Sequence, residues 1–386
     1  MLYLGETTFR RRFEQFGIRA RDRLSHLYVV GKTGVGKSTF LERLAEQDLA
    51  AGRGLAVIDP HGDLAEVLAA HVPDWRRHQL RYLDATDPTQ PYGYNPLRRV
   101  RDDRIPLAAS GLMDTLKKLW PDAWGVRMEH VLRNSLYTLL ERDGSTLPDL
   151  LRLYADKDFR MEITAHVRNG VVRRYWRDEF AHYPDRYRLE VVAPIQNKLG
   201  ALLSDPTLYR ILVGPHEPLR FRQIMDEGGI LIVNLAKGQL GEDSAATLGG
   251  LLVSTLGLAA LSRADMAAEE RRPFYAYIDE FQSFTTLAFA NLLAEVRKYG
   301  LSLTLAHQYL DQLEPEVRSA VLGNAGTLAA FRLGAEDAAA LAPEFAPVFG
   351  STDLLTLPNR HFYLKLMIDG APSRPFSART LNADCG

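Results

Sequence analysis

Gly31-Lys-Thr-Gly-Val-Gly36-Lys37-Ser38 is the motif that best indicates which fold this chain adopts. It matches the pattern G-x-x-x-x-G-K-[ST], in which glycines let successive backbone N–H groups curl around a phosphate. The pattern is meaningful between a strand and a helix. Here the apolar run Leu27–Val30 precedes it, and a helical pattern from Ser38 to Ala50 follows. A glycine turn without a ligand is the plain alternative, and this context argues against it.

The motif predicts a role for most residues of the loop. We expect Lys37 to reach the β- and γ-phosphate oxygens of a nucleoside triphosphate, and the Ser38 hydroxyl to ligate Mg²⁺. The N-terminus of the following helix adds a favourable dipole at the phosphates. The expected nucleotide-binding residues are Gly31, Lys32, Thr33, Gly34, Val35, Gly36, Lys37, Ser38 and Thr39.

Strands and helices alternate around this loop. A buried strand is expected at Gly54–Asp59 and a helix at Leu64–Ala70, with Asp63 as its N-cap. This order predicts a parallel sheet with right-handed crossovers. The same rhythm returns later, with expected strands at residues 229–235, 274–279, 301–306, 327–333 and 362–368. The helices expected between them span residues 244–262, 286–299, 317–324 and 335–342.

The middle of the chain has a different pattern. From about Arg104 to Gly214 we find helical periodicity and no convincing buried strand. We therefore expect a helical insert between two α/β parts. The expected helices of the insert span residues 104–120, 128–142, 148–154, 159–169 and 191–203.

Composition narrows the class of protein. The 386 residues are 46% hydrophobic, enough for a large core, and the net charge of −1 gives no overall basic field that would point to nucleic acid. The single cysteine, Cys385, excludes an intrachain disulfide and a cysteine-based zinc site. No signal peptide is visible, and the longest apolar stretch, about Gly249 to Leu261, is shorter than the ~20 residues that a spanning helix needs. We expect a soluble, cytoplasmic chain.

A P-loop needs an acid at the end of a neighbouring strand, and the sequence offers two candidates. Asp59 opens Asp59-Pro-His-Gly62, which fits the D-x-x-G pattern of GTPase switches, whereas Asp279-Glu280 follows the apolar run FYAYI. We favour the second pair, in which Asp279 holds Mg²⁺ and Glu280 takes the proton from the attacking water. The plain alternative for Glu280 is a solvated carboxylate at a helix start.

The choice between the two acids is also a choice between ATP and GTP. A GTPase needs a guanine reader of the form Asn-Lys-x-Asp. The chain's Asn197-Lys198 lacks the aspartate and lies in the helical insert. Asp59 is then a turn and strand-end residue near the phosphates, and the nucleotide is ATP.

Three further polar residues stand where they could act on the nucleotide. Gln308 follows the expected strand Leu301–Ala306, and a polar residue at the carboxyl end of a strand faces the ligand crevice of an α/β sheet. Arg297 ends the expected helix Thr286–Tyr299, and Arg332 lies in a later strand. From the residues alone, Arg297 is explained equally well as a cation at a helix C-terminus, where it interacts favourably with the helix dipole. A buried ion pair or a strand edge would explain Arg332.

One basic segment of the insert interleaves arginines with aromatic residues. It comprises Arg168, Arg173, Arg174 and Arg177 around Tyr175 and Trp176. Such a pattern could grip a nucleic-acid backbone. We favour the plainer interpretation, a solvated helix face with its aromatic rings turned inward.

Eight segments together resemble the HerA–FtsK superfamily of DNA-pumping ATPases, and within it the TraD/TraG-type coupling proteins of conjugative transfer. They lie in the right order in both α/β parts, and as a set they are specific. The segments are 26–38 (HLYVVGKTGVGKS), 57–63 (VIDPHGD), 94–97 (YNPL), 232–238 (IVNLAKG), 277–281 (YIDEF), 297–300 (RKYG), 307–308 (HQ) and 331–333 (FRL).

The resemblance implies an α/β fold, a RecA-like P-loop core with a mainly parallel sheet, plus an inserted all-α domain. We place the core at residues 1–97 and 221–370, the insert at residues 98–220 and a tail at residues 371–386. The resemblance also implies a homo-hexameric ring, with ATP between subunits and DNA in the channel. It assigns Arg297, and after it Arg332, as arginine fingers on the neighbour's γ-phosphate, and Gln308 as a sensor.

We therefore expect an ATP-hydrolysing ring motor that translocates DNA, with ATP and Mg²⁺ as cofactors. One rival is a protein-secretion or pilus-assembly ATPase of the same superfamily, and another is a nucleotide-dependent binding switch that does not pump. The expected partners are DNA, further copies of the chain, and a nuclease or a membrane or secretion partner. Membrane coupling proteins carry N-terminal transmembrane helices and this sequence shows none. We expect no direct membrane insertion, and docking at the inner membrane only through a partner.

Overall fold

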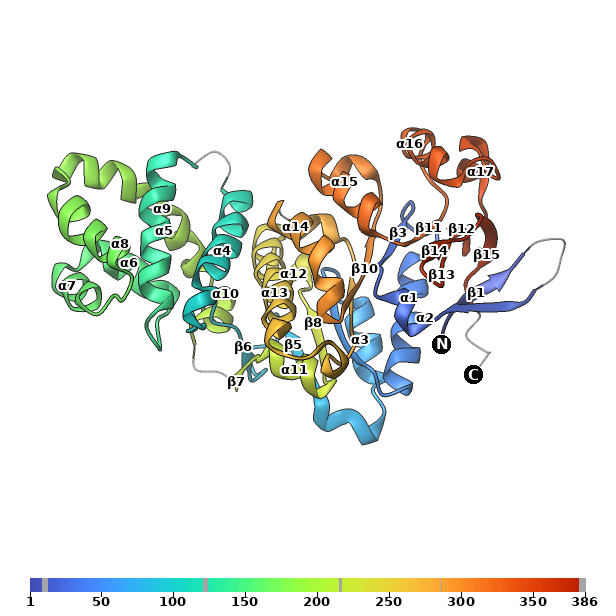
Figure 1. The fold of residues 1–386 in the computed structure, drawn as a ribbon, viewed down its shortest axis with the longest axis horizontal. Coiled ribbons are helices and arrows are strands. Elements are labelled where there is room, and N and C mark those ends of the chain that lie inside the picture. The colour runs from blue at the N-terminus through green and yellow to red at the C-terminus, as the bar shows by residue number, and fades with distance from the viewer. Residues whose placement is uncertain (9–12, 121–123, 215–216, 286, 382–386) are drawn as a thin grey trace. The chain divides into compact units, whose positions relative to one another are not determined.

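The chain was analysed as a computed structural model, which describes residues 1–8, 13–120, 124–214, 217–285 and 287–381 (Figure 1). Thr286 and Cys385, named above, lie outside the described residues. The chain forms two compact units. The sheet unit comprises Met1–Asp84, Arg220–Lys237 and Ala259–Gly386, and the helical unit comprises Ala85–Leu219 and Gly238–Leu258.

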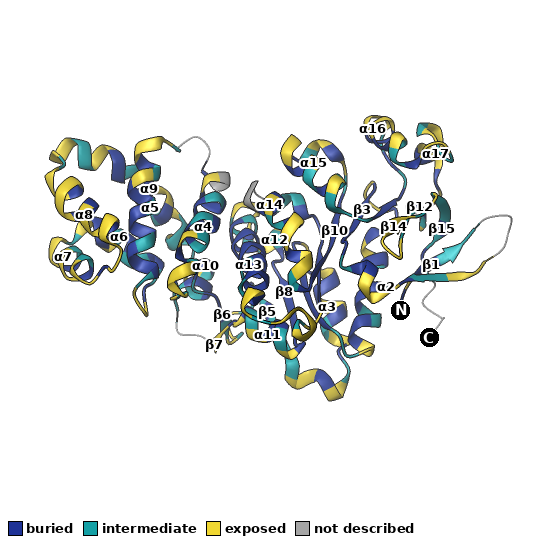
Figure 2. Ribbon diagram, viewed as in Figure 1, coloured by how far each residue is buried: buried dark blue, intermediate teal, exposed yellow. Residues whose placement is uncertain are grey.

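The larger part of the main sheet is parallel. Most of its strands are continuous apolar runs, because a parallel strand is covered on both faces, and Figure 2 draws them largely as buried. The neighbours β11, β3, β10, β9, β4, β8 and β5 all pair in parallel. Their bounds are β11 Thr327–Ala330, β3 Leu27–Val30, β10 Leu301–His307, β9 Phe274–Ile278, β4 Gly54–Asp59, β8 Ile230–Asn234 and β5 Leu80–Asp84.

Four antiparallel strands extend the sheet beyond β11, in the order β12, β15, β1 and β2. They are β12 (His361–Lys365), β15 (Phe376–Arg379), β1 (Leu2–Thr7) and β2 (Gln15–Ile18). The expected tail at residues 371–386 was wrong for residues 371–379, because β14 (Ala371–Pro372) pairs with β13 (Met367–Ile368) and β15 joins the main sheet. β15 is short and only partly buried, so it lacks the apolar run of a buried strand.

The strand order brings distant parts of the sequence together at one edge of the sheet. β10 lies between β3 and β9, and β9 lies between β10 and β4. Since all four strands are parallel, the residues that follow them gather at the same edge, which we call the carboxyl edge. We call the opposite edge, where these strands begin, the amino edge.

Helices join the strands of the sheet unit. They are α1 (Ala20–Arg23), α2 (Lys37–Ala50), α3 (Asp63–Ala70), α11 (Phe221–Glu227), α14 (Leu287–Val296), α15 (Pro315–Asn324), α16 (Ala335–Phe345) and α17 (Ser351–Thr356). Asp63 is the first residue of α3 rather than its N-cap, which is Gly62.

The helical unit confirms the expected run of helices. It contains α4 (Ile105–Leu119), α5 (Val126–Leu140), α6 (Leu147–Ala155), α7 (Lys157–Ala165), α8 (Gly170–Arg174), α9 (Asp185–Ser204), α10 (Pro206–Leu212) and most of α13 (Glu242–Ser262). It also holds a short parallel pair, β6 (Tyr92–Gly93) with β7 (Glu217–Pro218), so it is not purely helical.

In the described part of the chain, one helix is long and apolar enough to cross a membrane. It spans Glu242–Asp265, which is α13 with the following turn, and so exceeds the apolar stretch identified in the sequence. Of its apolar window, 78% is buried inside the structure. Such burial is what the core helix of a globular protein shows.

Candidate nucleotide-binding site

The backbone of the P-loop requires glycine at specific positions. Gly36 has a φ of 107°, in the left-handed region that glycine adopts without strain. A Cβ atom on Gly31 would lie 2.6 Å from the Cβ of Phe331, the residue after β11, so only glycine lets the loop approach Phe331 this closely. The glycines of the motif therefore shape the loop as the sequence pattern requires.

The loop presents a set of donors suited to an anion. Gly36 caps α2 without a side-chain hydrogen bond, which leaves the first N–H groups of the helix without a side-chain acceptor. The Lys37 ammonium donates to the carbonyl oxygens of Gly31 (2.6 Å) and Lys32 (3.0 Å). Burial lowers the pKa of Lys37, and the carboxylates of Asp279 and Glu280 oppose that shift. Such a donor set fits the phosphates of a nucleotide.

Not all residues expected to bind the nucleotide can do so through their side chains. The Val35 side chain is buried in the core, and its carbonyl oxygen accepts a hydrogen bond from the Arg360 N–H. Val35 can therefore contribute only backbone groups, whereas Lys32, Thr33 and Ser38 are exposed.

Asp279 and Glu280 follow β9 directly and are both buried. The Ser38 hydroxyl lies 3.4 Å from Asp279 Oδ2, so the two groups expected to share the metal are neighbours. Burial raises the pKa of Asp279 to about 6, and the nearby carboxylates of Glu280 and Asp59 add to the effect. A cation beside these carboxylates would offset that repulsion.

The arrangement fits Mg²⁺ rather than a metal held by protein alone. Among the described residues, no cluster of three or more His, Cys, Asp or Glu side chains could hold a metal ion. Mg²⁺ commonly binds through one or two protein groups together with substrate phosphates. Asp279 and the Ser38 hydroxyl match that requirement.

Asp59 has a different position. Its Oδ1 accepts from the backbone N–H of His61 (2.9 Å), and its Oδ2 accepts from that of Ala65 (3.0 Å). Both oxygens are thus occupied in fixing the turn and the first turn of α3. This is the geometry of a strand-end residue that holds a turn.

Gln308 connects the P-loop to Glu280. The Thr33 hydroxyl donates to Gln308 Oε1 (2.8 Å), and Gln308 Nε2 donates to Glu280 Oε1 (2.7 Å). The connection is possible because β10, which Gln308 follows, lies between β3 and β9. The amide therefore touches both sides of the candidate site.

Gln282 is a site residue that the sequence analysis missed. It lies in η9 (Phe281–Ser283), and its Nε2 donates to Glu280 Oε2 at 2.5 Å. Both oxygens of Glu280 are therefore held by glutamine amides. The nearest signal in the sequence is its place two residues after the acid, which no motif singles out.

Arg297 lies far from this cluster in its own chain. It begins η10 (Arg297–Tyr299), just before β10 starts at the amino edge, while Gln308 follows β10 at the carboxyl edge. The seven residues of β10 span about 23 Å at the usual rise of a strand. Arg297 is exposed, and its side chain makes no hydrogen bond or ion pair with any described residue.

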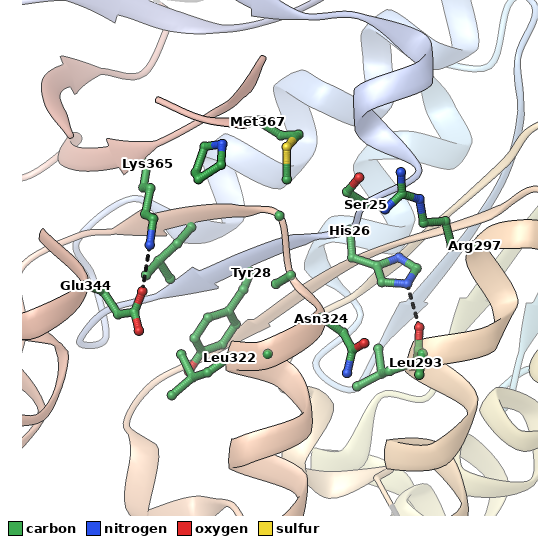
Figure 3. Close-up of a pocket in the computed structure, with 16 residues that line it drawn as sticks. Ser25, His26, Tyr28, Leu293, Arg297, Leu322, Asn324, Glu344, Lys365 and Met367 are labelled. Atoms are coloured by element: carbon green, nitrogen blue, oxygen red, sulfur yellow. Dashed lines mark hydrogen bonds and ion pairs between the residues drawn. The ribbon is translucent and has the colours of Figure 1, made fainter. Parts of the chain in front are cut away.

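The surroundings of Arg297 form a cavity of about 330 Å³ in the sheet unit. Figure 3 shows the Arg297 side chain beside Ser25 and His26, with the ion pair of Lys365 and Glu344 at the other end. The structure thus does not bring Arg297 to the P-loop of its own chain.

Arg332 follows β11 and lies next to the P-loop. Its carbonyl oxygen accepts from the Lys32 N–H (3.0 Å). The guanidinium donates to the Leu357 carbonyl (3.2 Å) and to Asn359 Oδ1 (2.9 Å). Arg332 is thus held within its own chain, unlike Arg297.

Two family models match parts of the chain. The model "Helicase HerA, central domain" matches residues 4–92, and the model "TraM recognition site of TraD and TraG" matches residues 273–357. The first range holds the P-loop, and the second holds Asp279, Glu280, Arg297 and Gln308. No curated protein matches the chain.

Solved structures share the fold across nearly the whole chain. The bacterial conjugative coupling protein TrwBΔN70, in its unbound form, has a TM-score of 0.69 at 17% identity and covers 98% of this chain and 89% of its own. TrwB with the ATP analogue ADPNP scores 0.68 at 18% identity, covering 94% and 86%. VirB4 of Thermoanaerobacter pseudethanolicus scores 0.67 at 15% identity, covering 99% and 96%.

The fold and the loop geometry define a P-loop ATPase with a RecA-like core and a helical insert. Within that class, the two family models and the shared fold agree with a resemblance to the HerA–FtsK superfamily and its TraD/TraG-type coupling proteins. The resemblance identified in the sequence is thereby confirmed.

Proposed function

We propose that this chain hydrolyses ATP in a ring of identical subunits and uses the reaction to move DNA. The observation that carries the proposal is the division of the catalytic parts between two edges of the sheet. The P-loop, Glu280 and Gln308 lie at the carboxyl edge, whereas the unpaired cation Arg297 lies at the amino edge. A site divided in this way is complete only when a second copy of the chain supplies the cation.

We assign the roles of the residues at the carboxyl edge as follows. Lys37 and the N-terminus of α2 bind the phosphates, and Ser38 and Asp279 would hold Mg²⁺, which neutralises charge on the phosphate oxygens. Glu280 accepts the proton of the attacking water. Gln308 keeps the Glu280 carboxylate in position and links it to Thr33 in the P-loop.

The ligands of TrwB support this assignment. TrwB has been solved with ADPNP and with ADP and Mg²⁺, and also with the GTP analogue GDPNP. We propose ATP and Mg²⁺ for this chain. Only a modest preference for ATP over GTP is expected, because the contacts of a P-loop are made to the phosphates and not to the base.

The proposed DNA substrate rests on the coupling proteins and the helicase model that the chain resembles. A near-neutral chain can still bind DNA, since a ring repeats each local basic patch in every subunit, and such binding is sensitive to salt. We place the motor in conjugation or type IV secretion, in the cytoplasm and docked to the inner membrane through a partner. A nuclease that prepares the DNA is a further expected partner.

The decisive experiment measures the ATPase rate of the full chain with and without single- and double-stranded DNA, alongside the mass of the assembly. We expect DNA to stimulate hydrolysis by a hexamer, and Lys37→Ala to serve as the inactive reference, because the phosphates lose their main counter-charge. An ATPase rate that DNA does not change would favour the alternative of a protein-secretion or pilus-assembly ATPase. A stable ATP-bound form with negligible turnover would favour the binding switch.

A further inference from the structure

The helical unit contains a cavity with charge of one sign. It has a volume of about 570 Å³ and is lined by residues from α7, from Gly170–His182 and from the start of α9. Its five charged lining residues are Lys157, Arg160, Arg173, Arg177 and Arg188, and no acidic residue lines it. We call it the basic cavity. In a chain whose net charge is −1, this concentration of cations is a local feature.

The cations of the basic cavity are only partly neutralised by the protein. The side chains of Lys157 and Arg173 are exposed and make no hydrogen bond or ion pair with any described residue. Arg177 pairs with both oxygens of Asp178. Arg188 donates to the Tyr183 carbonyl and lies 3.5 Å from Asp185, but its Nε atom is buried without a partner. Like charges held this close repel one another, and an anionic ligand would relieve that repulsion.

The backbone beside the basic cavity is also unusual. Tyr175–Glu179 forms one turn of π-helix, directly after α8, and it carries Trp176 and Arg177. Single π-turns are rare and occur frequently at functional sites. The π-helical turn is an observation independent of the charge, and it lies in the same wall of the basic cavity.

The aromatic residues beside the basic cavity cannot stack on the bases of a nucleic acid. Proteins that bind single strands stack bases on exposed aromatic rings, but Trp176 is only 4% exposed. Its Nε1 donates to the Thr138 hydroxyl (2.7 Å), and its ring packs edge-on against Phe180. The rings are turned inward, as the plainer interpretation of the sequence predicts.

What the basic cavity does expose is an apolar side chain. Met161 lines it and is 60% exposed. Methionine is flexible and polarisable, and proteins use it on surfaces that bind varied peptide side chains. Cations around an exposed methionine match a ligand that carries carboxylates and an apolar group together.

We propose that the basic cavity binds an acidic peptide segment of a partner protein. Carboxylates of the segment would pair with Lys157 and Arg173, and an apolar side chain would rest on Met161. The proposal goes beyond the proposed function, because it concerns which protein the helical unit recognises. It does not depend on whether the chain moves DNA.

The test measures the affinity of the full chain for a fluorescent peptide that alternates glutamate and leucine, by anisotropy. The double variant Lys157→Glu/Arg173→Glu should weaken binding about tenfold or more, since reversing both charges turns two attractive ion pairs into repulsive ones. Arg174→Glu/Arg186→Glu is the matched control. Both of its arginines are exposed and lie outside the cavity lining, and it changes the net charge equally.

A second variant tests the apolar contact separately. Met161→Ser should weaken binding of the glutamate–leucine peptide and leave binding of polyglutamate unchanged. Because all these positions are exposed, the variants should melt at the wild-type temperature by circular dichroism. Their basal ATPase rates should also match wild type, so a failure here would leave the ATPase proposal standing.

Three results would overturn the proposal. One is that the peptide does not bind, and another is that the matched control weakens binding as much as the cavity variant. The third is that oligo-dT binds more tightly than the peptide and loses affinity with the same Lys157 and Arg173 changes, in which case the basic cavity is a nucleic-acid site.

Discussion

Glu280 holds a backbone conformation that non-glycine residues seldom adopt, with a φ of 47° and a ψ of 46°. Such a conformation costs on the order of 1–3 kcal/mol and persists only where neighbours enforce it. Here the Glu280 N–H donates to Asp279 Oδ1 (3.0 Å), and the carboxylate is held by Gln282 and Gln308. These contacts therefore fix the carboxylate before any substrate arrives, which suits the role of base that we propose for Glu280.

The first prediction at the residue scale concerns Glu280→Gln. The amide preserves the shape of the side chain and removes the base, so nucleotide should still bind while hydrolysis falls at least ~10²-fold. Binding by a fluorescent ATP analogue and turnover by phosphate release would measure the two effects. Near wild-type turnover would contradict the role of Glu280.

Asp59→Asn is the matched comparison, because it also replaces a buried carboxylate at the carboxyl edge by an amide. Both oxygens of Asp59 accept backbone N–H groups, so this change should lower the unfolding temperature more than it lowers turnover. If Asp59→Asn abolishes hydrolysis while Glu280→Gln spares it, our choice between the two acids is wrong.

At the scale of elements, one buried ion pair joins a short helix, a long helix and a strand. Arg23 of α1 donates to both oxygens of Asp48 of α2 (2.8 and 2.7 Å), and Tyr277 of β9 donates to Asp48 at 2.6 Å. Arg23 and Asp48 are both buried. Removing one partner would leave a buried charge uncompensated.

The second prediction follows from that ion pair. Asp48→Ala should lower the free energy of unfolding by ~3–5 kcal/mol, because the Arg23 charge stays buried. The double variant Arg23→Met/Asp48→Asn should recover most of that loss, since it removes both charges and nearly keeps the side-chain volumes. Urea unfolding followed by circular dichroism would measure both, and an equally unstable double variant would count against this explanation.

The third prediction concerns pH and the start of β3. His26 is buried, its Nδ1 accepts from the Leu303 N–H (3.1 Å), and its Nε2 lies 2.9 Å from the Leu293 carbonyl. Only the neutral ring protonated on Nε2 can make both hydrogen bonds, because Nδ1 must accept while Nε2 donates. Burial lowers the pKa of His26 to about 4, with the Leu293 bond opposing and Arg297 adding to the shift.

The sign of the pH effect follows from this depressed pKa. The unfolded chain, with a histidine pKa of ~6.5, binds more protons than the folded chain between that value and the folded pKa of about 4. Stability from His26 is complete above the unfolded pKa and is lost as the pH falls towards 4, by up to ~3 kcal/mol. His26→Asn should be less stable at neutral pH and should flatten this part of the profile of urea midpoint against pH. An unchanged slope would contradict the assignment.

The elements differ in how far the sequence predicts them, for physical reasons. β3, β4 and β9 are predictable because buried parallel strands are continuous apolar runs. β5 and β15 are not, since both are partly exposed and carry polar residues within short segments.

The candidate site shows the same contrast. Lys37, Ser38 and Asp279 are predictable because phosphate and metal binding impose a motif on them. The contacts of Gln308 and Gln282 with Glu280 depend on β10 lying between β3 and β9, and on one 3₁₀ turn. Such order and local geometry arise from tertiary packing, which no short motif records.

At the scale of the whole molecule, the sheet separates Arg297 from its own nucleotide site. The length of β10, about 23 Å at ~3.3 Å per residue, lies between the Arg297 side and the Gln308 side. An arginine finger that acts in trans can contribute ~10³–10⁵ in rate. The fourth prediction is that Arg297→Ala subunits still bind ATP but do not hydrolyse it.

Mixed assemblies test this trans role directly. Arg297→Ala chains and Glu280→Gln chains are each inactive alone, because every interface lacks one of the two groups. In mixed rings, some interfaces combine Glu280 of the Arg297→Ala chain with Arg297 of the Glu280→Gln chain, and these sites are complete. Phosphate release should therefore recover in proportion to such interfaces.

The control for mixing is Arg332→Ala, whose guanidinium is bonded to Leu357 and Asn359 of its own chain. If Arg297 is the main finger, Arg332→Ala chains should retain more hydrolysis alone than Arg297→Ala chains do. Mixed rings without recovered ATPase, despite co-assembly demonstrated by mass measurement, would count against the trans role.

Strictly sequential firing around the ring could also block recovery, so a structure with a bound ATP analogue decides the matter by the distance from Arg297 to the neighbour's γ-phosphate. A guanidinium within hydrogen-bond reach of that phosphate supports the trans finger, and one that still lies in the cavity beside Ser25 and His26 excludes it.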